Sequence, residues 1–208
     1  MNVSLISLII YGLIILGAYL IGAIPTGYII SKLFGNINIL KKGSGNIGAS
    51  NVGRELGKKF FFLVFFIDAG KALCAVKLSV YLLDLFFISY NFYFLFFTSL
   101  VLLLGNCFSV FLKFYGGKGV ATSIGILLAL YPLKLSLFFM LIWGIIFFIT
   151  YIPSYASLGA ISLTVIFSSF FDVCEHEKIL FLWLILTLVI IRHWDNIVLL
   201  RKKFLSGE

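Results

Sequence analysis

A short segment near residue 50 gathers glycines, small hydrogen-bonding side chains and basic side chains. It reads Lys41-Lys-Gly-Ser-Gly-Asn-Ile-Gly-Ala-Ser-Asn-Val-Gly-Arg54. Three glycines within six residues allow the backbone to turn several N–H groups toward one anion, as in phosphate-binding nests. Arg54 adds a planar fork of donors that matches phosphate. The spacing is not the Walker or dinucleotide fingerprint, so the segment predicts either a separate kind of anion site or a flexible loop beside lipid headgroups.

A second glycine-rich segment follows a long apolar run. Gly116, Gly117 and Gly119 surround Lys118 directly before a helix that is expected to begin near Val120. The free N–H groups of a helix amino terminus, with a lysine nearby, form a ready anion site. The alternative is a tight turn between helices, with a lysine that snorkels to the membrane surface. Two consecutive glycines and a third nearby exceed what a turn requires, which favours the anion site.

A third polar segment, Ile191-Arg-His-Trp-Asp-Asn-Ile197, lies at the end of the last apolar run. His193 and Asn196 are three residues apart and therefore share one helix face. Histidine can accept a proton near neutral pH, so His193 is a candidate general base. A histidine at a membrane boundary can equally be structural, and the residue types alone leave both interpretations open.

The composition indicates that membrane helices position these segments. The 208 residues are 62% hydrophobic and 12% charged, and the mean hydropathy is +1.16, whereas a soluble domain has about 25% charged residues. Such a chain cannot cover itself with polar surface in water, so its solvent must be the bilayer. We expect an all-α, polytopic transmembrane helix bundle that forms one domain over residues 1–208.

The apolar runs predict about seven crossings, since a span needs about 20 mostly apolar residues. The expected spans cover residues 5–30, 60–83, 92–112 and 179–197, with three shorter ones within 120–171. The division of 120–171 rests on the breakers Tyr131-Pro132 and Ile152-Pro153-Ser154.

The net charge of +8 indicates either an anionic binding partner or a location in the membrane where basic residues are favoured. Nucleic acid is not expected, because no soluble basic patch or aromatic-interleaved sheet is predicted to hold it. Lysine and arginine are enriched in cytoplasmic loops. With seven spans, an outer amino terminus and a cytoplasmic carboxyl terminus, all three polar segments lie on the cytoplasmic face. Two spans within 120–171 would instead place the basic tail outside.

The ionisable residues outside the three segments are expected to have structural and not catalytic roles. Asp68 and Lys71 are three residues apart inside the second span and are expected to form an ion pair, rather than a proton path. The three cysteines have no metal-ligand spacing, so no metal site is expected.

Together, the three polar segments resemble the bacterial acyl-phosphate-dependent glycerol-3-phosphate acyltransferases. The resemblance extends over nearly the whole chain and is carried by the following residues: Gly22-Ala-Ile-Pro-Thr-Gly-Tyr28, Gly43-Ser-Gly-Asn-Ile-Gly-Ala-Ser-Asn51 with Arg54, Gly116-Gly-Lys-Gly-Val-Ala-Thr122, and Arg192-His193 with Asn196-Ile197. It implies transfer of a fatty acyl group from acyl phosphate to the 1-hydroxyl of glycerol 3-phosphate. Lysophosphatidic acid and phosphate are the products, and neither coenzyme A nor another cofactor takes part. It also implies a bacterial inner-membrane protein in contact with lipid, with its active site on the cytoplasmic face.

The resemblance implies roles for residues of all three segments. The catalytic set comprises Ser44, Arg54, Lys118, His193 and Asn196. The substrate-binding set comprises Gly43, Gly45, Asn46, Asn51, Gly116, Gly117, Gly119, Thr122 and Ser157. The glycerol hydroxyl can lose its proton to His193 or to an oxygen of a substrate phosphate, and the sequence does not choose between them.

The chain departs from the family pattern at four positions outside the central residues of the three motifs. Asn106 stands where the family usually has His, and Ser109 where it usually has Pro. Leu199 replaces a frequent Arg, and Glu208 lies in the nearest match to a displaced closing Gly-Thr-Glu. The central residues of the three motifs are intact, so we expect an active enzyme. A small transporter of anionic metabolites is the main rival, but its polar residues would line a midplane path and not gather at one face.

Overall fold

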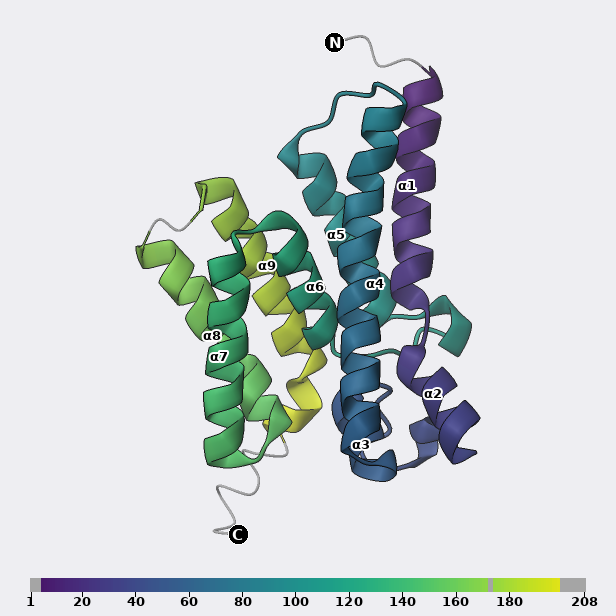
Figure 1. The fold of residues 1–208 in the computed structure, drawn as a ribbon, viewed down its shortest axis with the longest axis vertical. Coiled ribbons are helices and arrows are strands. Elements are labelled where there is room, and N and C mark those ends of the chain that lie inside the picture. The colour runs from purple at the N-terminus through teal and green to yellow at the C-terminus, as the bar shows by residue number, and fades with distance from the viewer. Residues whose placement is uncertain (1–4, 172–173, 199–208) are drawn as a thin grey trace. The chain divides into compact units, whose positions relative to one another are not determined.

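The regular elements of the structure, a computed structural model that describes residues 5–171 and 174–198, are all helices (Figure 1). The predicted all-α membrane class is confirmed. In chain order the elements are α1 (Leu5–Ala23), α2 (Thr26–Gly35), the 3₁₀ turn η1 (Ile39–Lys41), α3 (Ala49–Leu56), α4 (Lys58–Leu85), α5 (Phe92–Cys107), the 3₁₀ turn η2 (Val110–Leu112), α6 (Val120–Leu130), α7 (Leu133–Thr150), α8 (Pro153–Phe170) and α9 (His176–Arg192).

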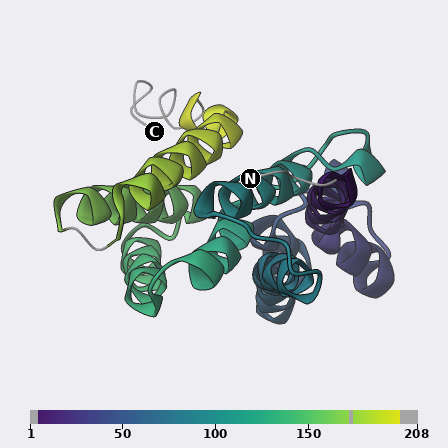
Figure 2. The same ribbon diagram turned by 90° about the horizontal axis from the view of Figure 1, so that it is seen from above.

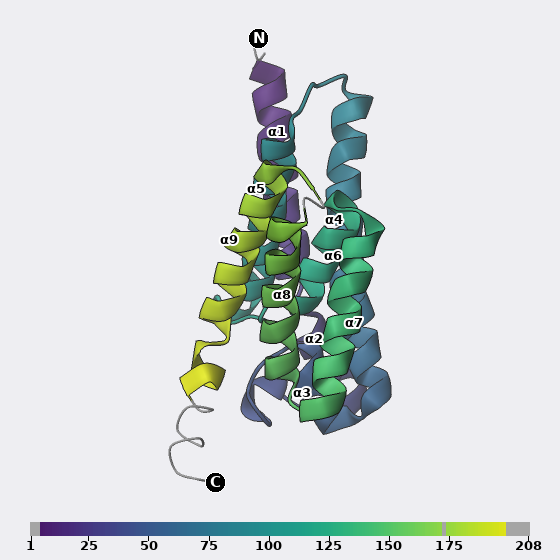
Figure 3. The ribbon, with the colours of Figure 1, turned by 90° about the vertical axis from the view of Figure 1, so that its left-hand side faces the viewer.

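The helices form two compact units. The first ends at Ala129 and contains α1 to α5 and nearly all of α6, while the second begins at Leu130 and contains α7 to α9. In the first unit, α1 and α4 are seen nearly end-on in Figure 2. In the second, α8 lies between α7 and α9 and packs against both (Figure 3). The single domain over residues 1–208 stays a prediction.

The first apolar run is broken near its end. A continuous span to about residue 30 was expected, but α1 ends at Ala23 and α2 begins at Thr26. Pro25 lies between them. A proline ring has no N–H to donate and clashes with the preceding turn of a helix, which disfavours a continuous helix here. The break reorients the chain just before the first polar segment.

The apolar stretch after the second glycine loop is divided as predicted. Helix α6 ends at Leu130, α7 begins after Pro132, and α8 begins at Pro153. With 11 residues, α6 is about 16 Å long, shorter than a hydrocarbon core of about 30 Å.

Four stretches of the described residues are long and apolar enough to cross a bilayer: Leu5–Gly35, Phe92–Leu112, Leu133–Thr150 and Pro153–Phe170. The seven crossings and their orientation therefore remain predictions. Helix α9 covers most of the expected last span but begins and ends earlier, at His176 and Arg192. Its first turn carries Glu177, which complements the partial positive charge of a helix amino terminus. The basic tail lies outside the described residues.

Two glycines bring α1 and α5 together. A Cβ atom on Gly22 would collide with the carbonyl of Leu102, and one on Gly105 would collide with the carbonyl of Tyr19. Lipid tails are as apolar as the helices, so membrane helices associate through close backbone approach at small residues. The α1–α5 contact therefore depends on both glycines.

We expect Gly22→Ala to lower the melting temperature in detergent by about 3–10 °C, because the added methyl group must push the Leu102 backbone away. Gly17→Ala is the matched control on the same helix, since nothing lies within 4 Å of its Cβ position. That control should melt at the same temperature or slightly higher, because alanine favours helix over glycine. Equal melting temperatures for the two variants would contradict the packing argument.

Candidate functional site

The first glycine loop is organised by Asn51. This side chain lies in the first turn of α3 and is only 2% exposed. Its Oδ1 atom accepts the N–H of Ser44 at 3.0 Å. Its Nδ2 atom donates to the carbonyls of Lys42 at 3.0 Å and Asn46 at 2.9 Å. Both amide protons of Asn51 thus bind the loop itself, so its predicted contact with substrate is left to the second lone pair of Oδ1.

The glycines of this loop supply conformation more than free N–H groups. Gly43 and Gly45 have φ angles of 52° and 68°, in the left-handed region that other residues rarely adopt. The N–H of Gly45 donates to Lys42 at 2.9 Å, and the N–H of Gly48 donates to the Asn46 side chain at 2.8 Å. Together with that of Ser44, three amides suggested by the glycine pattern are bonded inside the loop. An anion here is left to side chains such as the exposed Ser44 and Arg54.

The two glycine loops contact each other within the first unit. The side-chain Nδ2 atom of Asn46 donates to the carbonyl of Gly116 at 3.2 Å. The N–H of Gly117 donates to the carbonyl of Asn106 at 2.9 Å, which folds the second loop back on the end of α5. A Cβ atom on Gly116 would collide with the carbonyl of Cys107. A hydrogen bond therefore joins two segments that are 70 residues apart in the sequence.

Lys118 lies between two tightly placed glycines. Gly119 has a φ of 81°, and a Cβ there would be 2.7 Å from the Leu103 side chain. The Lys118 side chain is half-buried, and α6 begins two residues later. Thr122, in the first turn of α6, is 1% exposed, and its hydroxyl has no hydrogen-bond partner among the described residues. This end of the unit thus offers a cation and a buried hydroxyl beside the first loop.

His193 lies in the second unit, at the carboxyl end of α9, and is 3% exposed. Its Nδ1 atom is 2.8 Å from the carbonyl oxygen of Val189. A carbonyl only accepts hydrogen bonds, so Nδ1 carries the proton and the lone pair of the neutral ring is on Nε2. Asn196 is half-buried in the helical stretch 194–198 that follows. The nitrogen that can accept a proton is therefore Nε2.

Ser157 also lies in the second unit. Its hydroxyl donates to the carbonyl of Pro153 at 2.8 Å and accepts the indole N–H of Trp143 at 3.1 Å. The bond with Trp143 ties α8 to α7, whereas the bond to Pro153 lies within α8. The structure therefore gives Ser157 a packing contact, and its predicted contact with substrate stays a prediction.

The first unit holds Ser44, Arg54, Lys118 and Thr122 together with the glycines, and the second holds Ser157, His193 and Asn196. Leu199 and Glu208 lie outside the described residues. The described residues contain no group of three or more His, Cys, Asp or Glu side chains that could hold a metal ion.

The structure uses two residues that the motifs did not assign. Asn106 is 6% exposed and its carbonyl anchors Gly117. Ser109 is 1% exposed and its hydroxyl donates to the carbonyl of Ala23 at 2.5 Å. Both positions depart from the family pattern. The sequence signal that could have identified them is that each is a polar residue near the end of an apolar span, where a polar residue needs a partner from another part of the fold.

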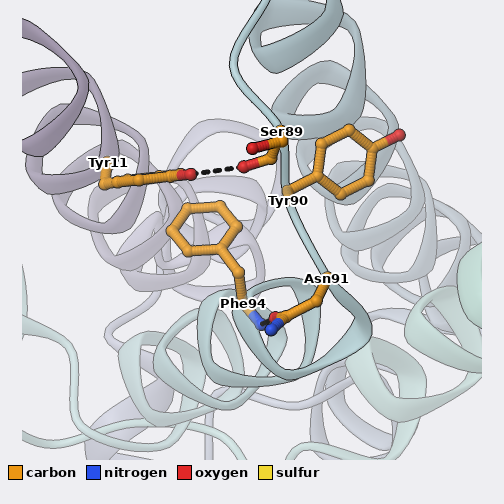
Figure 4. A pocket seen from close by; sticks show the side chains of 5 residues that line it. All are labelled: Tyr11, Ser89, Tyr90, Asn91 and Phe94. Atoms are coloured by element: carbon orange, nitrogen blue, oxygen red, sulfur yellow. Dashed lines mark hydrogen bonds between the residues drawn. The ribbon is translucent and has the colours of Figure 1, made fainter. Parts of the chain in front are cut away.

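A cavity of about 400 Å³ lies elsewhere in the first unit and is lined by Tyr11, Ser89, Tyr90, Asn91 and Phe94. The Tyr11 hydroxyl points to the carbonyl of Ser89 and donates to it (Figure 4). Desolvation and the charge of Asp84 raise the pKa of Tyr90. No predicted site residue lines this cavity.

Comparison with known proteins shows what class of protein carries this arrangement. The apolar helices and the likeness to a solved membrane enzyme make the chain an integral membrane protein. The sequence model described as glycerol-3-phosphate acyltransferase matches residues 12–203. The chain belongs to the glycerol-3-phosphate acyltransferase family, and the resemblance predicted from the motifs is confirmed.

Individual relatives match over nearly their whole length. The glycerol-3-phosphate acyltransferase of Wolbachia pipientis subsp. Culex pipiens (strain wPip) is 38% identical over 197 residues, which cover 93% of this chain and 98% of the relative. The enzyme of Aquifex aeolicus (strain VF5) is 37% identical over 197 residues, covering 94% and 95%. The crystal structure of PlsY (YgiH), an integral membrane glycerol 3-phosphate acyltransferase in its glycerol 3-phosphate form, has a TM-score of 0.80 and 34% identity, covering 95% of this chain and 92% of its own. The lysophosphatidic acid form has a TM-score of 0.78.

We expect Asn51→Ala to loosen the first glycine loop, because three hydrogen bonds from one buried side chain are lost. Trypsin should then cleave after Lys41 or Lys42 in the folded protein about tenfold faster or more, since cleavage follows the population of the open loop. Asn91→Ala removes an exposed helix cap at the start of α5 and is the control. Equal cleavage rates in the two variants would contradict the role of Asn51.

Proposed function

We propose that the protein transfers a fatty acyl group from acyl phosphate to the 1-hydroxyl of glycerol 3-phosphate, as a step of phospholipid synthesis. The products are lysophosphatidic acid and inorganic phosphate. The observation that carries this proposal is the bond from Asn46 to Gly116, which joins two basic glycine loops. Both substrates carry a phosphate group, and two adjacent loops provide places for both.

Arg54 and Lys118 are the groups that hold phosphate in this proposal. The guanidinium of Arg54 is exposed on α3 and can bind two phosphate oxygens at once. Lys118 supplies a point charge from the second loop. Because internal bonds occupy the amides of Ser44, Gly45 and Gly48, side chains provide most of the contact with the anion in the first loop.

The reaction needs positioning more than activation. The glycerol oxygen attacks the acyl carbon, the bond from that carbon to the phosphate oxygen breaks, and phosphate leaves with the bonding electrons. Acyl phosphate is already an activated donor, so holding both substrates in line supplies much of the acceleration. The cations stabilise the negative charge that develops on the acyl oxygen and the leaving phosphate. Neither coenzyme A nor a metal or other cofactor takes part.

Two acceptors remain for the proton of the glycerol hydroxyl. His193 is one, through Nε2, because its Nδ1 proton is bound to Val189. A phosphate oxygen of a substrate is the other, in which case His193 and Asn196 only position the substrates.

The proposed location is the bacterial inner membrane, with the active site on the cytoplasmic face. The relatives named above come from bacteria. Exposed basic residues of the first unit cluster around the glycine loops, among them Lys41, Lys42 and Lys113. This distribution is typical of cytoplasmic surfaces and favours contact with anionic lipid headgroups. The acyl chains of donor and product would lie in lipid or between helices.

The direct test supplies purified protein with acyl phosphate and glycerol 3-phosphate, and measures released phosphate and lysophosphatidic acid together. We expect equal amounts of both. Acyl coenzyme A in place of acyl phosphate should give no product above background. Folded protein that makes no product would contradict the proposed reaction, and equal rates with both donors would contradict the proposed donor.

We expect Arg54→Ala and Lys118→Ala each to lower kcat/KM for a phosphorylated substrate by about tenfold to a thousandfold, because each removes a cation that faces developing charge. Lys134→Ala, an exposed lysine on α7, is the control and should keep its activity. The measurement is steady-state kinetics with each substrate varied in turn. Unchanged kinetics in both site variants would contradict the two-loop site.

His193→Phe separates the two proton acceptors. If Nε2 is the general base, we expect kcat to fall by about a hundredfold or more. A loss below about tenfold would favour a substrate phosphate as the acceptor. His176→Phe, at the exposed amino end of α9, is the control for the loss of a histidine.

A further inference from the structure

The break between α1 and α2 leaves backbone carbonyls without helical partners. In a membrane protein such carbonyls must find a donor, because no water in the hydrocarbon core replaces one. The Nζ atom of Lys71 donates to the carbonyls of Gly22 and Ile24, both at 2.9 Å. The hydroxyl of Ser109 donates to the carbonyl of Ala23. Side chains from two distant segments therefore hold the break in place.

The break is connected to the first glycine loop. Thr26, the first residue of α2, is 4% exposed and donates to Oδ1 of Asp68 at 2.8 Å. Lys71 pairs with the same oxygen at 2.8 Å, as expected of these two charged residues. The next residue, Gly27, lies so close to the carbonyl of Ile47 that a Cβ atom would collide with it. Ile47 belongs to the first loop, so the position of α2 sets the position of that loop.

The break is also connected to the second glycine loop. Ser109 begins a tight turn, in which its carbonyl accepts the N–H groups of Leu112 at 3.1 Å and Phe114 at 2.8 Å. Lys113 and Phe114 have φ angles of 54° and 65°, which non-glycine residues adopt only when the surroundings hold them there. Only Tyr115 separates this turn from Gly116 in the sequence. The hydroxyl of Ser109 therefore fixes the start of the segment that leads into the second loop.

We propose that the break at Ile24-Pro25 is a shared anchor for both glycine loops, and that Thr26, Asp68, Lys71 and Ser109 are positioning residues of the acyl transfer. These side chains act through backbone that lies next to the loops. Each loop binds a substrate phosphate in the proposed reaction, so a displaced loop binds its substrate less tightly, and a misplacement of about 1 Å also slows a reaction that depends on proximity. The inference rests on the proposed function for its kinetic consequences, and on the structure alone for the anchoring.

The kinetic test uses Thr26→Val and Ser109→Ala, which remove one hydroxyl each. We expect each variant to raise KM for at least one of the two phosphorylated substrates by about five- to tenfold. Thr26→Ser should restore the wild-type value, because it restores the donor to Asp68. The double variant should raise KM by less than the product of the single effects, since both residues hold one segment. KM does not depend on the amount of folded enzyme, so lower stability alone would not change it.

Thr98→Val is the matched control. Thr98 is 1% exposed in α5, and among residues 5–171 and 174–198 its hydroxyl bonds only to the carbonyl of Phe94 in its own helix. Its KM values should stay within twofold of wild type. An equal rise of KM in Thr98→Val, or unchanged KM values in both anchor variants, would overturn the proposal.

Hydrogen exchange measured by mass spectrometry tests the anchor without any reaction. Thr26→Val should speed exchange in residues 43–48, where the bonded amides of Ser44, Gly45 and Gly48 lie. Ser109→Ala should speed exchange in residues 116–119, which include the bonded amide of Gly117. Unchanged exchange in both segments would overturn the anchor even in an active enzyme. Faster exchange with a wild-type protein that makes no product would support the anchor and reject only the proposed function.

Discussion

The first unit depends on how the carbonyls at the Pro25 break are satisfied. A helix that ends inside a membrane protein exposes carbonyls that lipid cannot bind. Here a buried lysine and a buried serine supply the donors, and the lysine charge is balanced by Asp68. The ion pair of Asp68 and Lys71 would be costly in lipid, but here its lysine also donates hydrogen bonds to backbone carbonyls at the break. Any change that leaves these carbonyls unpaired disturbs α1, α2 and the turn after α5 together.

In the first glycine loop, backbone amides bond within the loop while exposed side chains face solvent. A glycine-rich segment suggests a nest of free N–H groups, but in the first loop the side chains of Asn51 and Asn46 accept the N–H groups of Ser44 and Gly48. The loop is preorganised by bonds that it makes with itself, and it presents exposed side chains to solvent. Preorganisation of this kind suits the proposed reaction, in which two anionic substrates must be held close together.

Much of the fold followed from the sequence, since the bilayer restricts spanning structure to helices and prolines break them at known positions. The helix boundaries near Pro132 and Pro153 are examples. The end of α1 at Ala23 could not be predicted in the same way, because a proline near the end of an apolar run can either kink a helix or end it. In the structure, Lys71 and Ser109 bring donors to the carbonyls around Pro25, and the N–H of Thr26 donates to the carbonyl of Ile24.

The sequence by itself determined the membrane class, the three polar motifs and the residue types that can hold phosphate, because hydropathy and side-chain chemistry are local properties. The tertiary structure decided which of those residues face outward and which hold the loops. Asn51 and Ser109 have the same donors and acceptors wherever they lie, and their roles depend on the backbone that folding places beside them. Partners such as Ala23 and Ser109, 86 residues apart, meet only when α1 packs against α5.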